Sequence, residues 1–124
     1  MRILVTGSRN WTDEQAIVRA LALLGAERDR ATTVIVHGDC PTGADAIVKR
    51  LAEEVGIPHE PHPADWKKHG TAAGPIRNQE MVNLGADVCL AFFLGDSRGT
   101  RDCRRRALRA GIKVVSYYQT LAVA

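Results

Sequence analysis

The sequence has little cysteine, few aromatic residues and no long apolar run. Its three cysteines are an odd number and form no Cys-x-x-Cys pair, which argues against a disulfide framework and against a structural zinc site. No apolar stretch approaches the roughly 20 residues that a membrane span requires, and the amino terminus lacks the pattern of a signal peptide. We therefore expect a cytoplasmic protein with no membrane partner, no metal and no cofactor.

The size and composition are those of an ordinary globular domain. A chain of 124 residues is long enough for one buried core and too short for two. Apolar residues make up 45% and charged residues 25%, with no repeat and no low-complexity tract. We expect a single domain that spans residues 1–124.

Short β-rich runs alternate with segments of helical periodicity along the whole chain. The runs that predict strands are residues 2–6, 33–37, 59–62, 88–94 and 113–117, the last followed by a short apolar tail. Helical spacing follows the first four of them, with capping-box spacing at Thr12 and Gln15 and again at Thr42 and Asp45. This alternation predicts an α/β fold, a doubly wound sheet of about five parallel strands in the order 3-2-1-4-5 with helices on both faces.

Glycine-rich turns follow the strands, and the sheet order brings them to one edge. In such sheets a ligand binds beyond the carboxyl ends of the strands, where the strand order reverses. Here the reversal falls between the first and fourth strands, whose turns are residues 7–9 and 95–100, and the turn at residues 38–43 lies on the same rim. One crevice would then collect backbone amides, arginines, a carboxylate and a stacking ring, as a nucleotide requires.

The stretch Gly95–Asp102 is the strongest single indication of a site. It connects the most apolar run to a helix, and the unpaired N–H groups of a helix start bind anions. Thr100 adds a hydroxyl, Arg98 a positive charge, and Asp102 a carboxylate one turn into the helix. The alternative is an ordinary strand-to-helix connection that binds nothing.

Several other residues allow both a functional and a structural interpretation. Trp66 lies in a long polar loop, residues 63–74, where it either stacks on a base or covers the edge of the core. Asp45 either contacts the ligand or only caps its helix. We place Arg77 in the first turn of a helix that begins at Pro75, where positive charge opposes the helix dipole, and this favours a ligand role for it.

The net charge of +3 and the arginines of residues 98–109 invite a nucleic-acid hypothesis. On a helix these arginines spread around the circumference and leave Cys103, Ala107 and Ala110 to face the sheet. Aromatic interleaving of the kind that binds single strands is missing. A solvated helix face is therefore the preferred interpretation.

Taken together, the motifs resemble the YspA-like, YpsA-related branch of the SLOG superfamily. The matching segments are Gly7-Ser8-Arg9 with Trp11, His37-Gly38, Gly43-Ala44-Asp45, Pro63-Ala64-Asp65-Trp66, His69-Gly70, Ala73-Gly74-Pro75-Ile76-Arg77-Asn78 with Met81, and Ser97-Arg98-Gly99-Thr100. The resemblance implies a Rossmann-like fold related to the LOG (lonely guy) phosphoribohydrolases and to DprA-type DNA-processing domains. It also implies a nucleotide-derived ligand, a phage or mobile-element setting, and a homo-oligomer.

The LOG enzymes cleave the bond between a base and ribose 5′-monophosphate. Arg77 and Met81 match their Arg-x-x-x-Met motif, and Gly99, Thr100 and Asp102 are similar to the end of their glycine-rich turn. Asp96 and Ser97 stand where those enzymes have paired glycines, and Asp96 would bring negative charge toward a phosphate. Phosphate cradling by Ser97–Thr100 is therefore expected to survive these changes better than the chemistry.

Three functions follow from these observations. The first is a sensor or sequestering module that binds a nucleotide or nucleotide-derived small molecule. The ligand-binding residues expected for it are Gly7, Ser8, Arg9, Gly38, Gly43, Asp45, Trp66, Asn78, Ser97, Arg98, Gly99 and Thr100. The second is a LOG-like N-glycosidic hydrolase in which Arg77 and Asp102 are catalytic, and the third is DNA binding through the arginine-rich helix.

Overall fold

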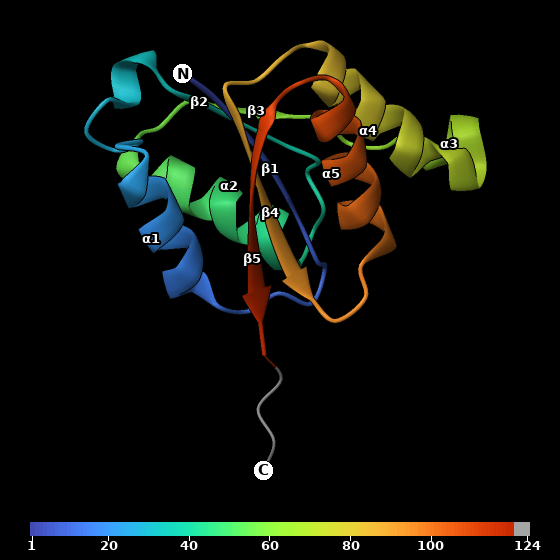
Figure 1. Cartoon of the computed structure of the whole chain (residues 1–124), viewed down its shortest axis with the longest axis horizontal. Helices are drawn as coiled ribbons and strands as arrows, with labels where there is room; N and C mark the ends of the chain where they lie inside the picture. Colours follow the sequence, from blue (N-terminus) through green and yellow to red (C-terminus); the bar gives the residue numbers. More distant parts are fainter. Residues whose placement is uncertain (121–124) are drawn as a thin grey trace.

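The computed structural model describes residues 1–120 and contains one five-stranded parallel sheet in the order β3-β2-β1-β4-β5. The strands are β1 (Arg2–Gly7), β2 (Val34–His37), β3 (His59–Pro61), β4 (Val88–Leu94) and β5 (Lys113–Gln119). The α-helices are α1 (Glu14–Leu23), α2 (Gly43–Val55), α3 (Trp66–His69), α4 (Ala73–Asn83) and α5 (Arg98–Arg109), with 3-10 turns at Arg30–Thr32 and Gly70–Ala72. The predicted α/β class and strand order are confirmed (Figure 1). The apolar tail expected after the last strand falls at residues 121–124, outside the described residues.

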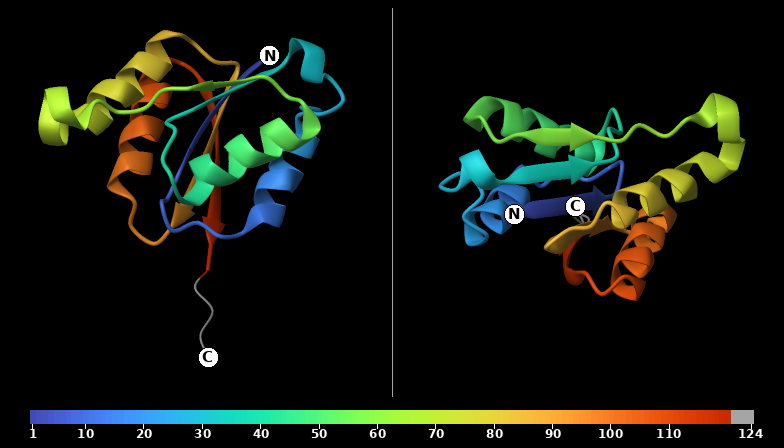
Figure 2. Two further views of the ribbon diagram at one scale, coloured as in Figure 1. Left: turned by 180° about the vertical axis from the view of Figure 1, so that it is seen from behind. Right: turned by 90° about the horizontal axis from the view of Figure 1, so that it is seen from above.

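Helices cover both faces of the sheet. α1 and α2 pack on one face and α4 and α5 on the other, while the short α3 projects beyond the sheet (Figures 1 and 2). The alternation of side chains along β1 makes this division, because Ile3 and Val5 enter the core under α1 and α2 while Leu4 enters the core under α4 and α5. Among the helices of the described part, none combines the length and the apolar character needed to cross a membrane.

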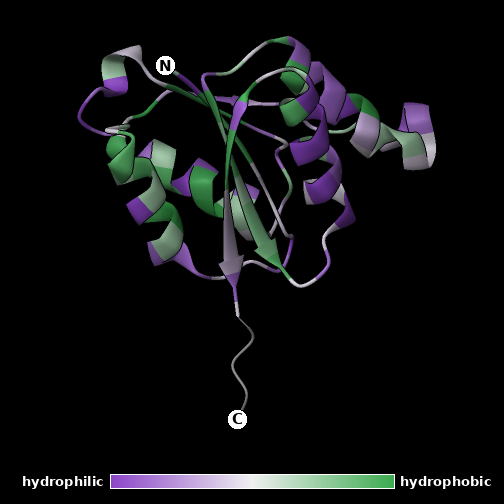
Figure 3. Cartoon of the chain, viewed as in Figure 1, coloured by the Kyte–Doolittle hydropathy of each residue, from purple (hydrophilic) through white to green (hydrophobic). Residues whose placement is uncertain are grey.

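The central strands are the most apolar part of the molecule. Every residue of β4 is buried, and the hydropathy colouring shows this strand as a continuous apolar band, whereas α5 is largely hydrophilic (Figure 3). Helices cover both faces of the sheet at β4, so side chains on both faces of this strand are buried. This explains why β4 is an unbroken apolar run rather than an alternating one. The carboxyl ends of β1 and β4, which are neighbours in the sheet, therefore lie side by side at one edge of the sheet.

The start of α1 differs from the prediction. Asp13, not Thr12, is the N-cap, because an oxygen of its carboxylate accepts a hydrogen bond from the N–H of Ala16 at 3.1 Å. Thr12 is instead bound to the amide side chain of Gln119, a partner that lies across the sheet in β5. The helix ends at Leu23.

The start of α4 also corrects the sequence prediction. The helix begins at Ala73, directly after a 3-10 turn, so Pro75 is its third residue rather than its first. Arg77 consequently lies in the second turn, where the helix dipole has little effect on its charge. The dipole argument for a ligand role of Arg77 is therefore wrong.

The buried stripe of α5 is shifted toward its amino terminus. Thr100, Cys103 and Ala107 are buried against the sheet, as expected for the last two. Ala110 is exposed, because the helix ends at Arg109 and Ala110 is the C-cap. The burial of Thr100 fixes the first turn of α5 directly against the end of the sheet.

Candidate functional site

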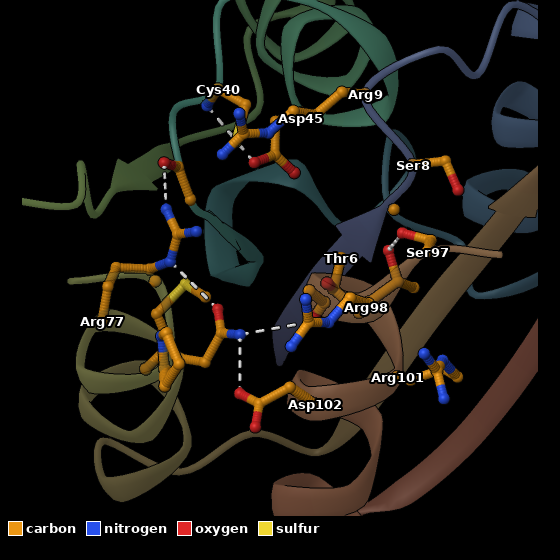
Figure 4. Close-up of a pocket in the computed structure, with 18 of the residues that line it drawn as sticks. Thr6, Ser8, Arg9, Cys40, Asp45, Arg77, Ser97, Arg98, Arg101 and Asp102 are labelled. Carbon is orange, nitrogen blue, oxygen red and sulfur yellow. Dashed lines mark hydrogen bonds between the residues drawn. The ribbon is translucent and has the colours of Figure 1, made fainter. Parts of the chain in front are cut away.

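A cleft of ≈ 950 Å³ opens at the carboxyl ends of β1 and β4 (Figure 4). This is the position where the strand order reverses, as the sequence predicts. The predicted site residues that line it are Gly7, Ser8, Arg9, Gly38, Asp45, Trp66, Arg77, Asn78, Ser97, Arg98, Gly99, Thr100 and Asp102. The structure thus brings together residues from turns that are up to 95 positions apart in the sequence.

Gly43 is the one predicted site residue that does not line the cleft. Its φ of +72° is in the left-handed region, and a side chain there would collide with the backbone of Ser8 and Arg9. The absence of a side chain lets the start of α2 touch the β1 turn, where the N–H of Ala44 donates to the carbonyl oxygen of Ser8 at 3.3 Å. Gly43 therefore supports the β1 turn, which forms part of the cleft wall, without lining the cleft itself.

Ser8 holds the two central strands together at the rim. Its hydroxyl oxygen accepts from the N–H of Leu94 at 2.9 Å, and its own N–H donates to the carbonyl oxygen of Phe92 at 2.9 Å. The residue is 2% exposed. Ser8 thus fixes the turn after β1 against the end of β4, so the spacing of the two turns that flank the cleft is set by the sheet itself.

The first turn of α5 presents free backbone donors to the cleft. Ser97 is the N-cap, but its hydroxyl bonds the hydroxyl of Thr100 at 2.6 Å instead of capping a backbone N–H. The leading N–H groups of a helix have no partner within the helix, and in residues 1–120 no side chain caps those of α5. A Cβ built at Gly99 would meet no atom within 4 Å, so space is open above this turn. The turn has the geometry of an anion site.

Two arginines flank the cleft without a carboxylate partner in residues 1–120. Arg9, from the β1 turn, lies over the ring of Trp66 with its guanidinium carbon 5.7 Å from the ring centroid. Arg98 is the first residue of α5 and is exposed. Trp66 is 49% exposed and does not cover the core, although one edge of its ring lies near Gly74 of α4. Both guanidinium groups are therefore available to a ligand.

Arg77 is buried, and two of its three side-chain nitrogens donate hydrogen bonds within the protein. One terminal nitrogen donates to the carbonyl oxygens of Gly38 at 2.6 Å and His62 at 3.2 Å, and Nε donates to Asn78 at 3.0 Å. The side chain is 9% exposed. Arg77 therefore joins α4 to the ends of β2 and β3, and only part of its guanidinium reaches the cleft.

Asp102 lies at the centre of a polar network between α4 and α5. Its carboxylate accepts from Asn78 at 3.0 Å, from Arg105 at 2.8 Å and from Arg106 at 2.9 Å. Partial burial acts to raise the pKa of Asp102, but the hydrogen bonds from Arg106 and Asn78 outweigh it and hold the pKa below its usual value. Asn78 also donates to the carbonyl oxygen of Gly99 at 3.2 Å, which links the network to the anion turn.

Asp96 does not act as an unbalanced negative charge in the cleft. Its exposed carboxylate pairs with Arg101 at 3.0 Å. The repulsion of a phosphate that the sequence suggests for this residue is therefore reduced by a neighbouring cation of α5.

Asp45 is the most buried carboxylate in the cleft wall. One oxygen accepts from the N–H of Cys40 at 3.3 Å, while the other, Oδ1, has no hydrogen-bond partner within residues 1–120. Burial raises the pKa of Asp45, and the thiol and amide of Cys40 only partly oppose this. The sequence spacing predicts that this carboxylate caps the helix start at Thr42. It binds the loop before that residue instead.

His37 closes β2 beside the cleft. Its Nδ1 accepts from the N–H of Asp39 at 3.1 Å, so Nε2 carries the proton and donates to Nδ1 of His59 at 3.0 Å. Burial, followed by the charge of His59, lowers the pKa of His37 to about 4. Asp39 has a φ of +54° and pairs with Lys49 at 3.1 Å. These contacts hold the loop that carries Gly38 and Cys40.

The sequence interpretation did not assign several residues of the cleft to it. These residues are Val5, Thr6, Asn10, Thr71, Gly74, Pro75, Met81 and Arg105. Cys40, Asp96 and Arg101 lie within the predicted turns at residues 38–43 and 95–102, and Asn10 directly extends the turn at residues 7–9, so its sequence position is a usable signal. Arg105 reaches the cleft only through its ion pair with Asp102, which depends on the helix phase.

Comparison with known proteins agrees with the motif pattern. Residues 1–69 match the family described as YspA, cpYpsA-related SLOG. The Gene 61 protein of Mycobacterium phage D29 is 48% identical over 121 residues, which cover 94% of this chain and 95% of the relative. No solved structure matches the chain.

Proposed function

The chain belongs to the YspA, cpYpsA-related SLOG family, a membership that suggests nucleotide-related binding, and from this premise we propose that it is a binding module for a nucleotide or nucleotide-derived small molecule. The phosphate of the ligand lies at the first turn of α5, its base stacks on Trp66, and Arg9 and Arg98 neutralise its charge. The protein acts as a sensor or a sequestering module.

The observation that carries this proposal is the uncapped first turn of α5. Its free N–H groups face the cleft together with Arg98, and Arg9 approaches from the β1 turn. Charge-assisted hydrogen bonds from such groups are the usual way in which proteins hold phosphate. A cleft of ≈ 950 Å³ also has the size of a small-molecule site.

The hydrogen bonds that Asp102 and Arg77 make within the protein favour a binding function over hydrolysis. A general base needs a free lone pair and a pKa near the working pH, whereas Asp102 accepts three hydrogen bonds and has a lowered pKa. Arg77 spends its hydrogen bonds on Gly38, His62 and Asn78. Both residues therefore support the cleft rather than perform chemistry in it.

Internal pairing of the arginines weighs against DNA binding through α5. Arg101, Arg105 and Arg106 pair with Asp96 or Asp102, and the guanidinium of Arg104 lies 4.5 Å from the centroid of the Phe93 ring. Each of these contacts must be given up or shared before the arginine can meet a DNA phosphate. The net positive charge of the helix surface is thus smaller than its composition suggests.

The test is calorimetric titration with nucleoside monophosphates, NAD and ADP-ribose, followed by chromatography of the mixture for free base. Arg98→Ala is expected to weaken binding roughly 10-fold or more, because it removes a charged donor from the anion turn. Arg109→Ala removes the same charge from the far end of α5 and is expected to bind like the unmodified protein.

Each outcome of this experiment decides between the functions. An unaltered ligand whose binding depends on Arg98 supports the binding module. Release of free base that is lost in Asp102→Ala would establish the hydrolase instead. Absence of any ligand, with salt-sensitive retention of DNA, would overturn the proposal in favour of nucleic-acid binding.

A further inference from the structure

Oδ1 of Asp45 is the one buried side-chain polar atom of the described residues that has no hydrogen-bond partner. Asp45 is 5% exposed, and Oδ1 has no hydrogen-bond partner within the described residues. A buried polar atom in this state costs free energy, and native proteins rarely leave one without a reason. The atom therefore indicates a donor that arrives from outside the chain.

Folding needs only one of the two carboxylate oxygens. Oδ2 accepts from the N–H of Cys40 and so ties the loop after β2 to the start of α2. The helix gains no side-chain cap from Asp45, since its N-cap, Thr42, lies outside this contact. A neutral amide side chain at this position would keep the contact with the N–H of Cys40, so this contact does not require the second oxygen.

The surroundings of Oδ1 limit what it can bind. In residues 1–120 no group of three or more metal-ligating side chains is present, so a metal has no ligand set here. The charge of Arg77 acts on Asp45, and that of Arg9 acts on its neighbour Cys40, which disfavours a second cation. A phosphate would be repelled by the carboxylate itself. The remaining partner is a neutral donor, and a hydroxyl has the required chemistry.

The strand order places Asp45 between the expected phosphate and base positions. From one edge of the cleft to the other, the contributing turns follow β4, β1, β2 and β3 in space. The anion turn of α5 follows β4, Asp45 lies beyond β2, and Trp66 follows β3. Figure 4 shows Asp45 and Cys40 on one side of the opening and Ser97 and Arg98 on the other. In a nucleotide that spans this cleft, the sugar lies between phosphate and base.

We infer that Oδ1 of Asp45 accepts a hydrogen bond from a sugar hydroxyl of the bound nucleotide, so that the cleft selects ribose over deoxyribose. This inference rests on the proposed function and names the sugar class of its ligand. Asp45 lines the cleft, and the terminal torsion of an aspartate varies over a broad range, so we expect its carboxylate to rotate and present Oδ1 when the ligand binds. Asp45 is then a specificity-determining residue rather than a helix cap.

The experiment compares each ribonucleoside 5′-monophosphate with its 2′-deoxy and 3′-deoxy forms by calorimetry. We expect one of the two deoxy forms to bind roughly 10- to 100-fold more weakly to the unmodified protein, as loss of a hydrogen bond to a charged group requires. In Asp45→Asn the difference between ribose and deoxyribose is expected to shrink several-fold, because the amide group that replaces Oδ1 offers the hydroxyl only an uncharged hydrogen bond. Asp29→Asn, which removes an exposed carboxylate outside the cleft, is the matched control and retains the preference.

The outcomes of this experiment distinguish a failure of this inference from a failure of the proposed function on which it rests. Equal binding of ribose and deoxyribose forms by the unmodified protein overturns the role of Asp45 and leaves the binding module intact. A ribose preference of unchanged size in Asp45→Asn overturns it as well, because the hydroxyl is then recognised elsewhere. If neither the monophosphates nor NAD and ADP-ribose bind the unmodified protein, the proposed function and this inference both fail.

Discussion

The guanidinium of Arg77 donates a hydrogen bond to the carbonyl oxygen of Gly38 at 2.6 Å and so joins α4 to the loop after β2. The two residues are 39 positions apart and meet in the wall of the cleft. This contact explains why an arginine is buried in this wall and why a glycine stands opposite it. Arg77 is therefore a residue that builds the cleft, whereas Arg9 and Arg98 are free to hold a ligand.

Gly38→Ala is expected to lower the free energy of unfolding by about 1–3 kcal/mol, because the added methyl group would collide with the guanidinium of Arg77. Gly99→Ala is the matched control, since no atom lies within 4 Å of a Cβ built there and alanine favours the helix. Urea denaturation measures both variants. Equal stability of Gly38→Ala and the unmodified protein would contradict the tight contact.

Arg77→Ala is expected to cost about 2–4 kcal/mol of unfolding free energy, because two backbone carbonyl oxygens and Asn78 lose their buried donor. Arg98→Ala removes an exposed side chain and is expected to stay within about 0.5 kcal/mol of the unmodified protein. Thermal melting distinguishes the two. A fully stable Arg77→Ala protein would show that Arg77 is held for a ligand rather than for the fold. Because Arg77→Ala is expected to be destabilised, loss of ligand binding identifies a direct ligand contact only in Arg98→Ala.

Cys40 should be the thiol that a reagent reaches first in the folded protein. It lines the cleft and is half-buried, whereas Cys89 and Cys103 are fully buried. Burial, and then the nearby charge of Asp45, raise the pKa of Cys40, so its reaction with a maleimide is expected to be slow at neutral pH and faster as the pH rises. Mass spectrometry should find one modified cysteine, and a bound nucleotide should protect it. Modification that persists in Cys40→Ser would contradict this assignment.

The stability of the protein is expected to fall as the pH drops from 6.5 to 4. His37 has a pKa of about 4 in the folded protein, lowered from 6.5, so the unfolded chain binds more protons in this window. The neutral histidine contributes its stability in full above pH 6.5, and at most about 3 kcal/mol is lost by pH 4.

The variant His37→Asn isolates this contribution from that of the carboxylates. Asparagine can still accept from the N–H of Asp39 but does not titrate, so its unfolding free energy should depend less steeply on pH between 6.5 and 4. His69→Asn, on α3 and away from β2, is the control and should follow the unmodified protein. Parallel pH profiles for His37→Asn and the unmodified protein would show that His37 is not the group responsible.

The sequence was sufficient to predict the order of the strands and the position of the cleft. Apolar runs and glycine turns are local signals, and the rule that parallel strands meet at their carboxyl ends converts them into a shared rim. For this reason the turn of Ser97–Thr100 and the turn of Ser8 and Arg9 were found together. The use of these residues for a ligand, and the single domain over residues 1–124, remain predictions.

What the sequence could not supply were contacts between distant segments. The start of α4 depends on the 3-10 turn before it, and Arg77 finds the carbonyl oxygen of Gly38 only when α4 packs beside β2. The unpaired oxygen of Asp45 is visible only when the atoms around it are known. The pairing of Asp102 with Arg105 and Arg106 has helical spacing and could have been expected from it.

The central claim is that the first turn of α5 holds the phosphate of a nucleotide. The most direct measurement is the amide NMR spectrum of the protein during titration with adenosine 5′-monophosphate and the other nucleotides. We expect the N–H signals of Arg98, Gly99 and Thr100 to shift together on saturation, and inorganic phosphate to shift the same signals more weakly. Saturable binding that leaves these three signals unchanged would contradict the central claim.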